Sequence, residues 1–151
     1  MIKIKFNWEK YIEKTESGYK IVNYAFNNNH NITSLEIPNY VTEIGVSSFM
    51  LCRKLESILL PDGLISIQKD AFKFCTALKE IIIPDSVVSI GSEVFSGCLS
   101  LNKIKISKNL KKPETFYYFN IENNVKTILL GKYIANKKGE YPGYWEITEN
   151  K

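Results

Sequence analysis

A chain of 151 residues with 44% hydrophobic and 24% charged residues has enough apolar side chains for one folded domain with a continuous core. This composition excludes a disordered chain, and a sequence without any run of about 18 apolar residues excludes a membrane-spanning helix. The formal net charge of +4 comes almost entirely from lysine, since Arg53 is the only arginine. We first interpret this weak positive charge as a feature of the overall composition, before assigning it a role in binding.

Residues 1–23 are predicted to form an N-terminal cap. The first six residues alternate charged and apolar side chains, so they lack the apolar core of a signal peptide. Trp8 and Tyr11 add bulk, and Gly18 precedes a second strand-like segment at 19–22. As written, the chain is therefore expected to stay in the cytoplasm, unless a leader has been removed from it.

The three cysteines reveal an internal repeat. Cys52, Cys75 and Cys98 are spaced by 23 residues each time. From each cysteine the sequence runs C-x-x-L-x-x-I-x-[LI], then into apolar residues at fixed offsets, with a proline after the first two. The first full coil has Leu55, Ile58, Leu60, Pro61, Leu64, Ile67 and Phe72, and the next has Leu78, Ile81, Ile83, Pro84, Val87, Ile90 and Phe95. The register extends back to Phe26 and, with one extra residue near Pro113, forward to Ile134, so we predict about five coils over residues 24–134.

Each coil contains one segment in which apolar residues recur at every second position, as in a half-buried strand. These strands are expected near residues 33–37, 56–60, 79–83, 102–106 and 126–130. Stacked at about 4.8 Å per neighbour, they would form a parallel sheet along the concave side of a solenoid. Pro38, Pro61 and Pro84 follow three of the strands, where a fixed φ turns the corner without removing a ladder hydrogen bond.

The returning side of each coil is too short and too rich in β-branched residues for a full helix. Residues 93–98 could form a single helical or 3₁₀ turn that points Phe95 and Cys98 inward. Gly45 and Gly91 follow inward isoleucines, which suits a bend with φ above zero, although Gln68 holds the matching place in the middle coil.

The run from Phe72 to Gly91 resembles the leucine-rich repeat of the BspA-like class, through its combined phenylalanine, cysteine, leucine, proline and glycine spacing. The resemblance covers about two thirds of the chain. It implies a leucine-rich-repeat solenoid used for adhesion and protein binding, in a class whose members are often displayed on bacterial or protist surfaces and share no catalytic site. The chain departs from the pattern at Asn29, which stands where a cysteine would be, and at Ser107, which stands in the place of proline.

Three thiols could bind a metal, form a disulfide or, with His30, act as a nucleophile. Repetition favours a different role, because equivalent residues of successive coils stack and would form a ladder of buried thiols. The sequence has no C-x-x-C spacing, no glycine-rich phosphate loop and no serine elbow. We therefore predict no catalytic site, no metal site and no cofactor. An odd number of regularly spaced cysteines also suits a reducing compartment.

The alternation of each strand predicts which side chains face outward on the concave side. The expected binding face consists of Ser34, Glu36, Ser57, Leu59, Glu80, Ile82, Lys103, Lys105, Thr127 and Leu129. Leu59 and Ile82 would be neighbours between an acidic and a basic margin, as in the centre of a small protein interface. The alternative is that β-propensity alone favours branched residues there.

A second hypothesis concerns the basic C-terminal half. Residues 101–138 hold a cluster of lysines interleaved with aromatic residues, which would attract nucleic acid or another polyanion. Without arginine forks or an RNA-binding motif this signal is weak, so a protein partner is favoured over nucleic acid. A third possibility is a structural spacer of a larger surface protein.

Residues 135–151 are predicted to form a C-terminal cap. They contain Tyr141, Pro142, Gly143, Tyr144 and Trp145, which suggest a turn followed by a last strand. An open solenoid exposes an unpaired strand at each end. We therefore expect a monomer or, where a cap is incomplete, a weak end-to-end dimer.

Overall fold

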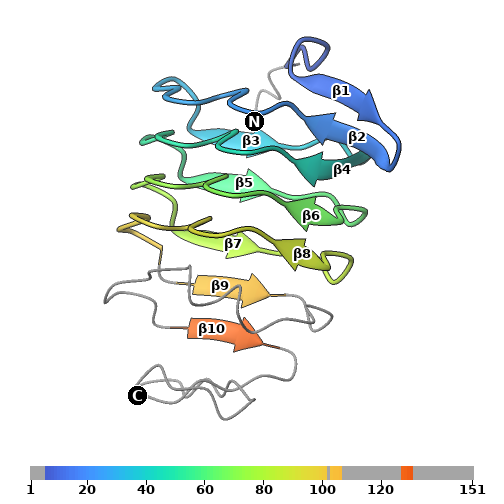
Figure 1. Cartoon of the computed structure of the whole chain (residues 1–151). Helices are drawn as coiled ribbons and strands as arrows, with labels where there is room; N and C mark the ends of the chain where they lie inside the picture. The colour runs from blue at the N-terminus through green and yellow to red at the C-terminus, as the bar shows by residue number, and fades with distance from the viewer. Residues whose placement is uncertain (1–5, 102, 107–126, 131–151) are drawn as a thin grey trace.

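The computed structural model describes residues 6–101, 103–106 and 127–130, and these form a β-solenoid (Figure 1). Successive coils stack along one axis, and each complete coil contributes two short strands and a run of turns. The described residues contain no helix.

The first strand of each coil lies where the alternating pattern predicts it. These strands are β3 (Ser34–Glu36), β5 (Ser57–Leu59), β7 (Glu80–Ile82), β9 (Lys103–Ile106) and β10 (Thr127–Leu130), one below another in Figure 1. β3 pairs with β5, β7 with β9, and β9 with β10, all parallel. β5 and β7 belong to separate sheets, but the Lys79 N–H donates to the Glu56 carbonyl oxygen at 3.3 Å and continues the stack. The predicted strand positions are thus confirmed.

A second series of short strands forms another sheet. The sequence analysis predicted only one of its strands, as the strand-like segment at 19–22, and did not predict the three strands that follow the proline corners. The sheet order is β1-β2-β4-β6-β8, formed by β1 (Ile12–Thr15), β2 (Gly18–Ile21), β4 (Val41–Ile44), β6 (Ser66–Ile67) and β8 (Ser89–Ile90). Each corner is closed by a hydrogen bond to a proline carbonyl oxygen, as from the Val41 N–H to Pro38 at 3.0 Å. The prolines therefore mark the change of direction between the two strands of a coil.

The segment that follows the second strand of each coil is a chain of turns. The prediction of a helical or 3₁₀ turn there was wrong. In the coil at residues 47–52, alternate N–H groups donate in two directions. Those of Ser47, Phe49 and Leu51 donate to carbonyl oxygens of the next coil, whereas those of Ser48, Met50 and Cys52 donate back three residues within their own coil. Ser47 and Leu51 have positive φ values of 51° and 63°. A helix would direct all these N–H groups along its own axis, so the bonds between coils replace it with a chain of turns.

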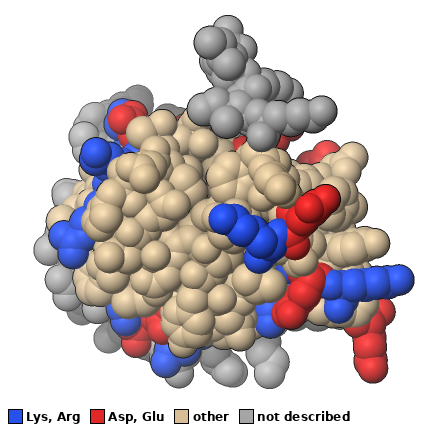
Figure 2. Space-filling model, turned by 90° about the horizontal axis from the view of Figure 1, so that it is seen from above, with Lys and Arg blue, Asp and Glu red and all other residues tan. Residues whose placement is uncertain are grey.

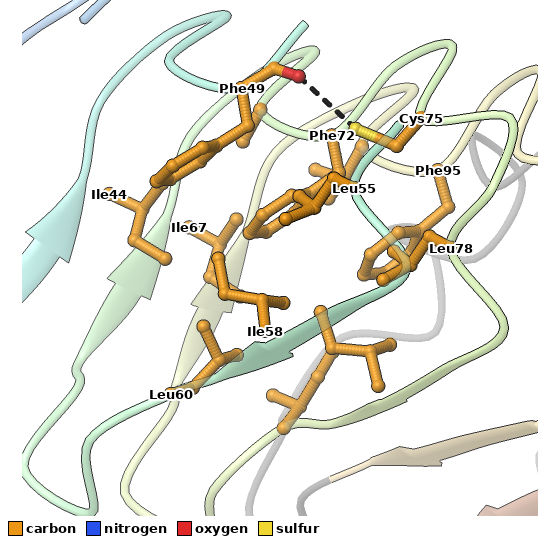
Figure 3. Packing of buried hydrophobic residues seen from close by; sticks show 14 of the residues in the cluster. Ile44, Phe49, Leu55, Ile58, Leu60, Ile67, Phe72, Cys75, Leu78 and Phe95 are labelled. Atoms are coloured by element: carbon orange, nitrogen blue, oxygen red, sulfur yellow. Dashed lines mark hydrogen bonds between the residues drawn. The ribbon is translucent and has the colours of Figure 1, made fainter. Parts of the chain in front are cut away.

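The core consists of columns of equivalent side chains, one from each coil (Figure 3). Phe26, Phe49, Phe72 and Phe95 stack with centroid separations of 5.0, 5.2 and 5.7 Å and interplanar angles of 7°, 6° and 8°. Offset stacking of this kind stabilises aromatic pairs beyond their buried area. The column confirms that residues 23 positions apart lie over one another.

The cysteines form a second column beside the phenylalanines, as predicted. Cys52, Cys75 and Cys98 are buried, and each thiol donates to a carbonyl oxygen 26 residues earlier, at 3.0–3.1 Å. Asn29 begins this column with different chemistry, since its Oδ1 accepts the N–H groups of Asn31 and Ile32. In the first coil, a side-chain amide that accepts hydrogen bonds from the backbone directly after it thus replaces the thiol.

Gly45 and Gly91 have a different role from the one expected. Neither has a positive φ, so they do not provide a left-handed bend. A Cβ on Gly45 would instead overlap the Ile21 carbonyl oxygen, and one on Gly91 would overlap the Lys69 nitrogen. Glycine is needed there because two coils approach each other closely.

Aromatic residues cover the N-terminal end of the phenylalanine column. Tyr11 stacks on Phe26 with a centroid separation of 4.4 Å, and Phe6 and Trp8 contact the same ring at 5.4 and 5.8 Å. β1 pairs antiparallel with β2 and ends the sheet. The predicted C-terminal cap, residues 135–151, lies outside the described residues.

Candidate protein-interaction face

The outward surface of β3, β5, β7 and β9 is called the β3 face here. It carries the described members of the predicted binding set, and every one of them is exposed: Ser34, Glu36, Ser57, Leu59, Glu80, Ile82, Lys103 and Lys105. The side chains between them, Leu35, Ile58, Ile81 and Ile104, point to the core side and are buried or half-buried. Thr127 and Leu129 belong to β10, opposite Lys103 and Lys105 in the register, and their side chains lie outside the described residues.

Leu59 and Ile82 are the apolar members of this face. Their exposed fractions are 59% and 50%, and they hold equivalent places on β5 and β7, 23 residues apart. Single exposed aliphatic residues are common on protein surfaces. Two in successive coils form a small contiguous apolar surface.

One ion pair between coils lies on the same face, and a second joins the residues directly before β5 and β7. Lys103 Nζ lies 3.3 Å from Glu80 Oε2, and Lys79 Nζ lies 2.7 Å from Glu56 Oε2. The hydrogen bond from Lys79 and its charge lower the pKa of the Glu56 carboxyl group from its ordinary value. Because these side chains are exposed, each pair stabilises the fold only weakly, and the pairs serve mainly to shape the charge pattern of the face.

The second sheet carries an exposed apolar pair that the sequence analysis missed. Ile65 and Val88 are 40% and 50% exposed, and the Val88 N–H donates to the Ile65 carbonyl oxygen at 2.9 Å. Their spacing of 23 residues was a usable signal. It was overlooked because the second strand of the coil had not been recognised.

The N-terminal end of the solenoid has a broad uncharged area, with most charged side chains at its margin (Figure 2). An open hollow at this end is lined partly by aromatic residues: Phe6, Trp8, Tyr19 and Tyr40. Tyr19 and Tyr40 contact each other edge to face, with centroids 5.2 Å apart. This is a surface that an end-to-end dimer would use, and such a dimer stays a prediction.

The thiols have the environment of structural side chains. Burial raises the pKa of Cys52 to about 11, and the neighbouring Cys98 thiol, followed by burial, raises the pKa of Cys75. A neutral thiol is a poor nucleophile and a poor metal ligand. Within residues 6–101, 103–106 and 127–130, no three His, Cys, Asp or Glu side chains are placed to hold a metal ion.

The basic C-terminal half is described only in part. Lys103 and Lys105 are exposed on β9. The other lysines of the predicted polyanion surface lie outside the described residues: Lys108, Lys111, Lys112, Lys126, Lys132, Lys137 and Lys138. Among the described residues, no helix is long and apolar enough to cross a membrane.

Comparison with known proteins gives the family of the repeat. Residues 11–136 match the BspA type leucine rich repeat region in six copies, one more than the five coils predicted from the sequence. β2 already lies in register with β4 before residue 24, where those five coils begin. A search of curated proteins found no match.

Several solved structures of bacterial leucine-rich repeat proteins are similar. A leucine rich cell surface protein from Faecalibacterium prausnitzii is 32% identical with a TM-score of 0.55, and the match covers 60% of this chain and 23% of that one. A leucine-rich repeat protein from Bacteroides capillosus is 32% identical with a TM-score of 0.53, covering 62% of this chain and 70% of that one. One from Eubacterium ventriosum is 19% identical with a TM-score of 0.56, covering 80% and 40%, and shows the shared fold alone. The repeat match, the stacked coils and these neighbours agree, and the chain belongs to the BspA type leucine-rich repeat family.

Proposed function

We propose that this protein is a non-enzymatic binding module that recognises a protein partner, in adhesion or a related contact, through the β3 face. The observation that carries the proposal is the exposed pair Leu59 and Ile82 in successive coils, with Glu36 on one side and Lys105 on the other. Protein interfaces combine an apolar centre with a polar margin, and this surface has both.

Two further observations support the proposal. The core columns hold the strands through buried side chains, so the outward residues are free to vary without loss of the fold. The similar Faecalibacterium prausnitzii protein is described as a cell surface protein, which fits a role in adhesion. This chain spans about a quarter of that protein's length.

A catalytic role has little support among the described residues. All three cysteines are buried, and the thiol pKa values of Cys52 and Cys75 are raised above the ordinary value. His30, the only histidine of the chain, is exposed, whereas Cys52, which lies in the next coil, is buried. A nucleophile and its base must lie within hydrogen-bond reach of each other, but the thiols of Cys52, Cys75 and Cys98 donate to backbone carbonyl oxygens instead.

The test is to pan a phage-displayed library of random peptides on the immobilised chain. Three forms are compared: the native chain, the double variant Leu59→Asp and Ile82→Asp, and the matched control Ile65→Asp and Val88→Asp. The control changes an equally spaced, similarly exposed pair on the other sheet. Circular dichroism and thermal unfolding establish that all three forms are folded.

We expect peptides enriched on the native chain to keep binding the control and to lose at least tenfold in affinity for the Leu59/Ile82 variant. A carboxylate placed on the apolar centre would lose its hydration when a partner binds, which costs at least about 1.4 kcal/mol. Equal binding to all three forms, or a loss only in the control, would remove the β3 face as the site.

The second candidate function is attachment to a polyanion. The exposed Lys103 and Lys105 on β9 favour it. Heparin and double-stranded DNA are the probes, each titrated from low to high salt. Tight binding that falls steeply with salt and is unaffected at Leu59 and Ile82 would support this candidate over the first. If the chain binds neither peptides nor polyanions, the remaining candidate is a structural spacer of a larger protein.

A further inference from the structure

β1 is the outermost strand of its sheet and lies at the N-terminal end of the stack (Figure 1). On one side it pairs with β2, in a register that places Ile12 opposite Ile21 and Thr15 opposite Gly18. No described residue pairs with its other side. β1 therefore has a free edge, and a free edge is a template on which a further strand can pair.

The hydrogen bonds of the hairpin show which backbone groups face this edge. The Val22 N–H donates to the Tyr11 carbonyl oxygen at 2.9 Å, so these two residues form a hydrogen-bonded pair. In an antiparallel ladder such pairs alternate with pairs that exchange no hydrogen bond. Glu13 therefore bonds to β2, whereas the N–H and C=O groups of Ile12 and Lys14 point away from β2. The free edge offers a donor and an acceptor from each of these two residues.

The aromatic hollow at the N-terminal end adjoins this edge. The side chains of Ile12 and Lys14 help to line it, together with Trp8, Tyr19 and Tyr40. Tyr19 stands opposite Lys14 in the register of the hairpin, so both lie on the same face of it. The hollow has a volume of about 710 Å³, which is the size of a binding pocket. The two residues that offer free backbone groups thus also border a pocket for side chains.

We propose that the free edge of β1 binds an extended segment of a partner protein, which joins the sheet as an antiparallel strand and places a bulky apolar side chain in the hollow. In this mode of recognition, main-chain hydrogen bonds provide affinity and pockets for alternate side chains provide specificity. Antiparallel pairing is required, because it puts the side chains of the bonded residues on the same face as Ile12 and Lys14. The site is separate from the β3 face and does not depend on the proposed function.

A second copy of this chain fits the edge less well. Two antiparallel β1 strands that use the free backbone groups of both copies would pair Ile12 with Lys14 of the other copy, and Glu13 with its own counterpart. Like charges directly opposite each other are destabilising. Each hollow would also face a lysine in place of an apolar side chain. The edge therefore favours a different protein as its partner.

The test uses a capped, fluorophore-labelled peptide with the core Thr-Trp-Thr-Val-Thr and two analogues that differ from it only by N-methylation. One analogue carries methyl groups on the tryptophan and valine amides, and the other carries one on the central threonine amide. Fluorescence anisotropy measures the affinity of each peptide for the full chain. Hydrogen exchange of the Ile12 and Lys14 amides, followed by NMR, gives a second readout.

We expect the parent peptide and the threonine analogue to bind, and the tryptophan and valine analogue to bind at least about tenfold more weakly, because it loses the donors that face β1. The exchange of the Ile12 and Lys14 amides should slow when the parent peptide binds. The Glu13 amide, which bonds to β2, should be protected with or without peptide.

Two pairs of variants locate the site on the chain. Lys14→Pro should weaken binding at least about fivefold, because it removes an outward N–H at an edge position where proline is tolerated. Lys14→Thr, which keeps this N–H, is the matched control and should bind like the native chain. Tyr40→Asn should weaken binding about fivefold through the loss of aromatic contact, whereas Tyr24→Asn, at an exposed tyrosine outside the hollow, should not. Thermal unfolding establishes that all four variants are folded.

Several results would overturn the inference. Equal binding by all three peptides, or a loss only with the threonine analogue, would contradict antiparallel main-chain pairing. Binding without slower exchange at Ile12 and Lys14 would place the peptide elsewhere on the chain, and absence of binding by the parent peptide would remove the site. A native chain that is dimeric in sedimentation and becomes monomeric as Lys14→Pro would show that a second copy fills the edge. None of these results bears on the β3 face, which the library panning tests separately.

Discussion

Cys75 Sγ donates a hydrogen bond to the carbonyl oxygen of Phe49, at 3.1 Å and across 26 residues of sequence (Figure 3). The same bond recurs one coil earlier and one coil later, from Cys52 to Phe26 and from Cys98 to Phe72. The thiol column therefore links neighbouring coils through side chain and backbone together. Each thiol also fills apolar space beside the phenylalanine column.

Cys75→Ala is expected to lower the free energy of unfolding by about 2 kcal/mol, since it removes a buried side-chain atom and one hydrogen bond to Phe49. Urea denaturation followed by circular dichroism measures the change. Thr76→Ala is the matched control, because Thr76 also donates to a carbonyl oxygen of the previous coil, at Arg53, but at the surface. That variant should lose less than about 0.5 kcal/mol. Equal losses in both variants would contradict a structural role for the thiol.

Stability is expected to fall as the pH rises from 9 toward 11, in part because of Cys52. Burial raises the pKa of this thiol from 9.0 to about 11, so between these values the folded chain holds a proton that the unfolded chain releases. The stabilising contribution is complete below pH 9 and is lost as the pH passes through the folded pKa. Urea denaturation between pH 8 and 10.5 should show a steeper decline for the native chain than for Cys52→Ala. If the free energy of unfolding declines equally in both proteins, Cys52 does not contribute to the pH dependence.

Phe72→Ala is expected to cost about 3–5 kcal/mol, because it opens a cavity in the middle of the stacked aromatic column. Leu99→Ala is the control, since Leu99 is 67% exposed, and it should change stability by less than about 0.5 kcal/mol. Thermal unfolding of the two variants compares them directly. A Phe72→Ala protein with native stability would show that the column contributes nothing.

Gly45→Ala and Gly91→Ala are each expected to destabilise the fold by about 1–3 kcal/mol, since the added Cβ meets backbone atoms of the preceding coil. Gly63→Ala should be neutral or stabilise by up to about 1 kcal/mol, because the nearest atom to its Cβ would be the Asn39 carbonyl oxygen at 3.7 Å and its φ is not positive. Denaturation midpoints of the three variants measure the effect. Similar losses at all three glycines would point to backbone entropy instead of close approach between coils.

The sequence by itself determined the period, the strands that begin each coil and the direction of their side chains. A repeat of 23 residues places equivalent apolar residues over one another, and burial of those residues is the largest stabilising term in the fold. Strand alternation then requires Ser57 and Leu59 to face outward when Ile58 faces inward. The thiol column followed from the same period, because residues repeated at the same place in three successive coils share one environment.

Only the tertiary structure decided what the rest of each coil does. The strands β6 and β8 are two residues long, too short to be distinguished from a loop by periodicity, and they exist because each pairs with the coil beside it. The turns at residues 47–51 place Ser47 and Leu51 at positive φ, which neither residue type favours alone. Hydrogen bonds to the next coil hold them there. Gly45 likewise depends on the distance between two coils. Contacts between segments far apart in the sequence decide these features, and no local pattern encodes them.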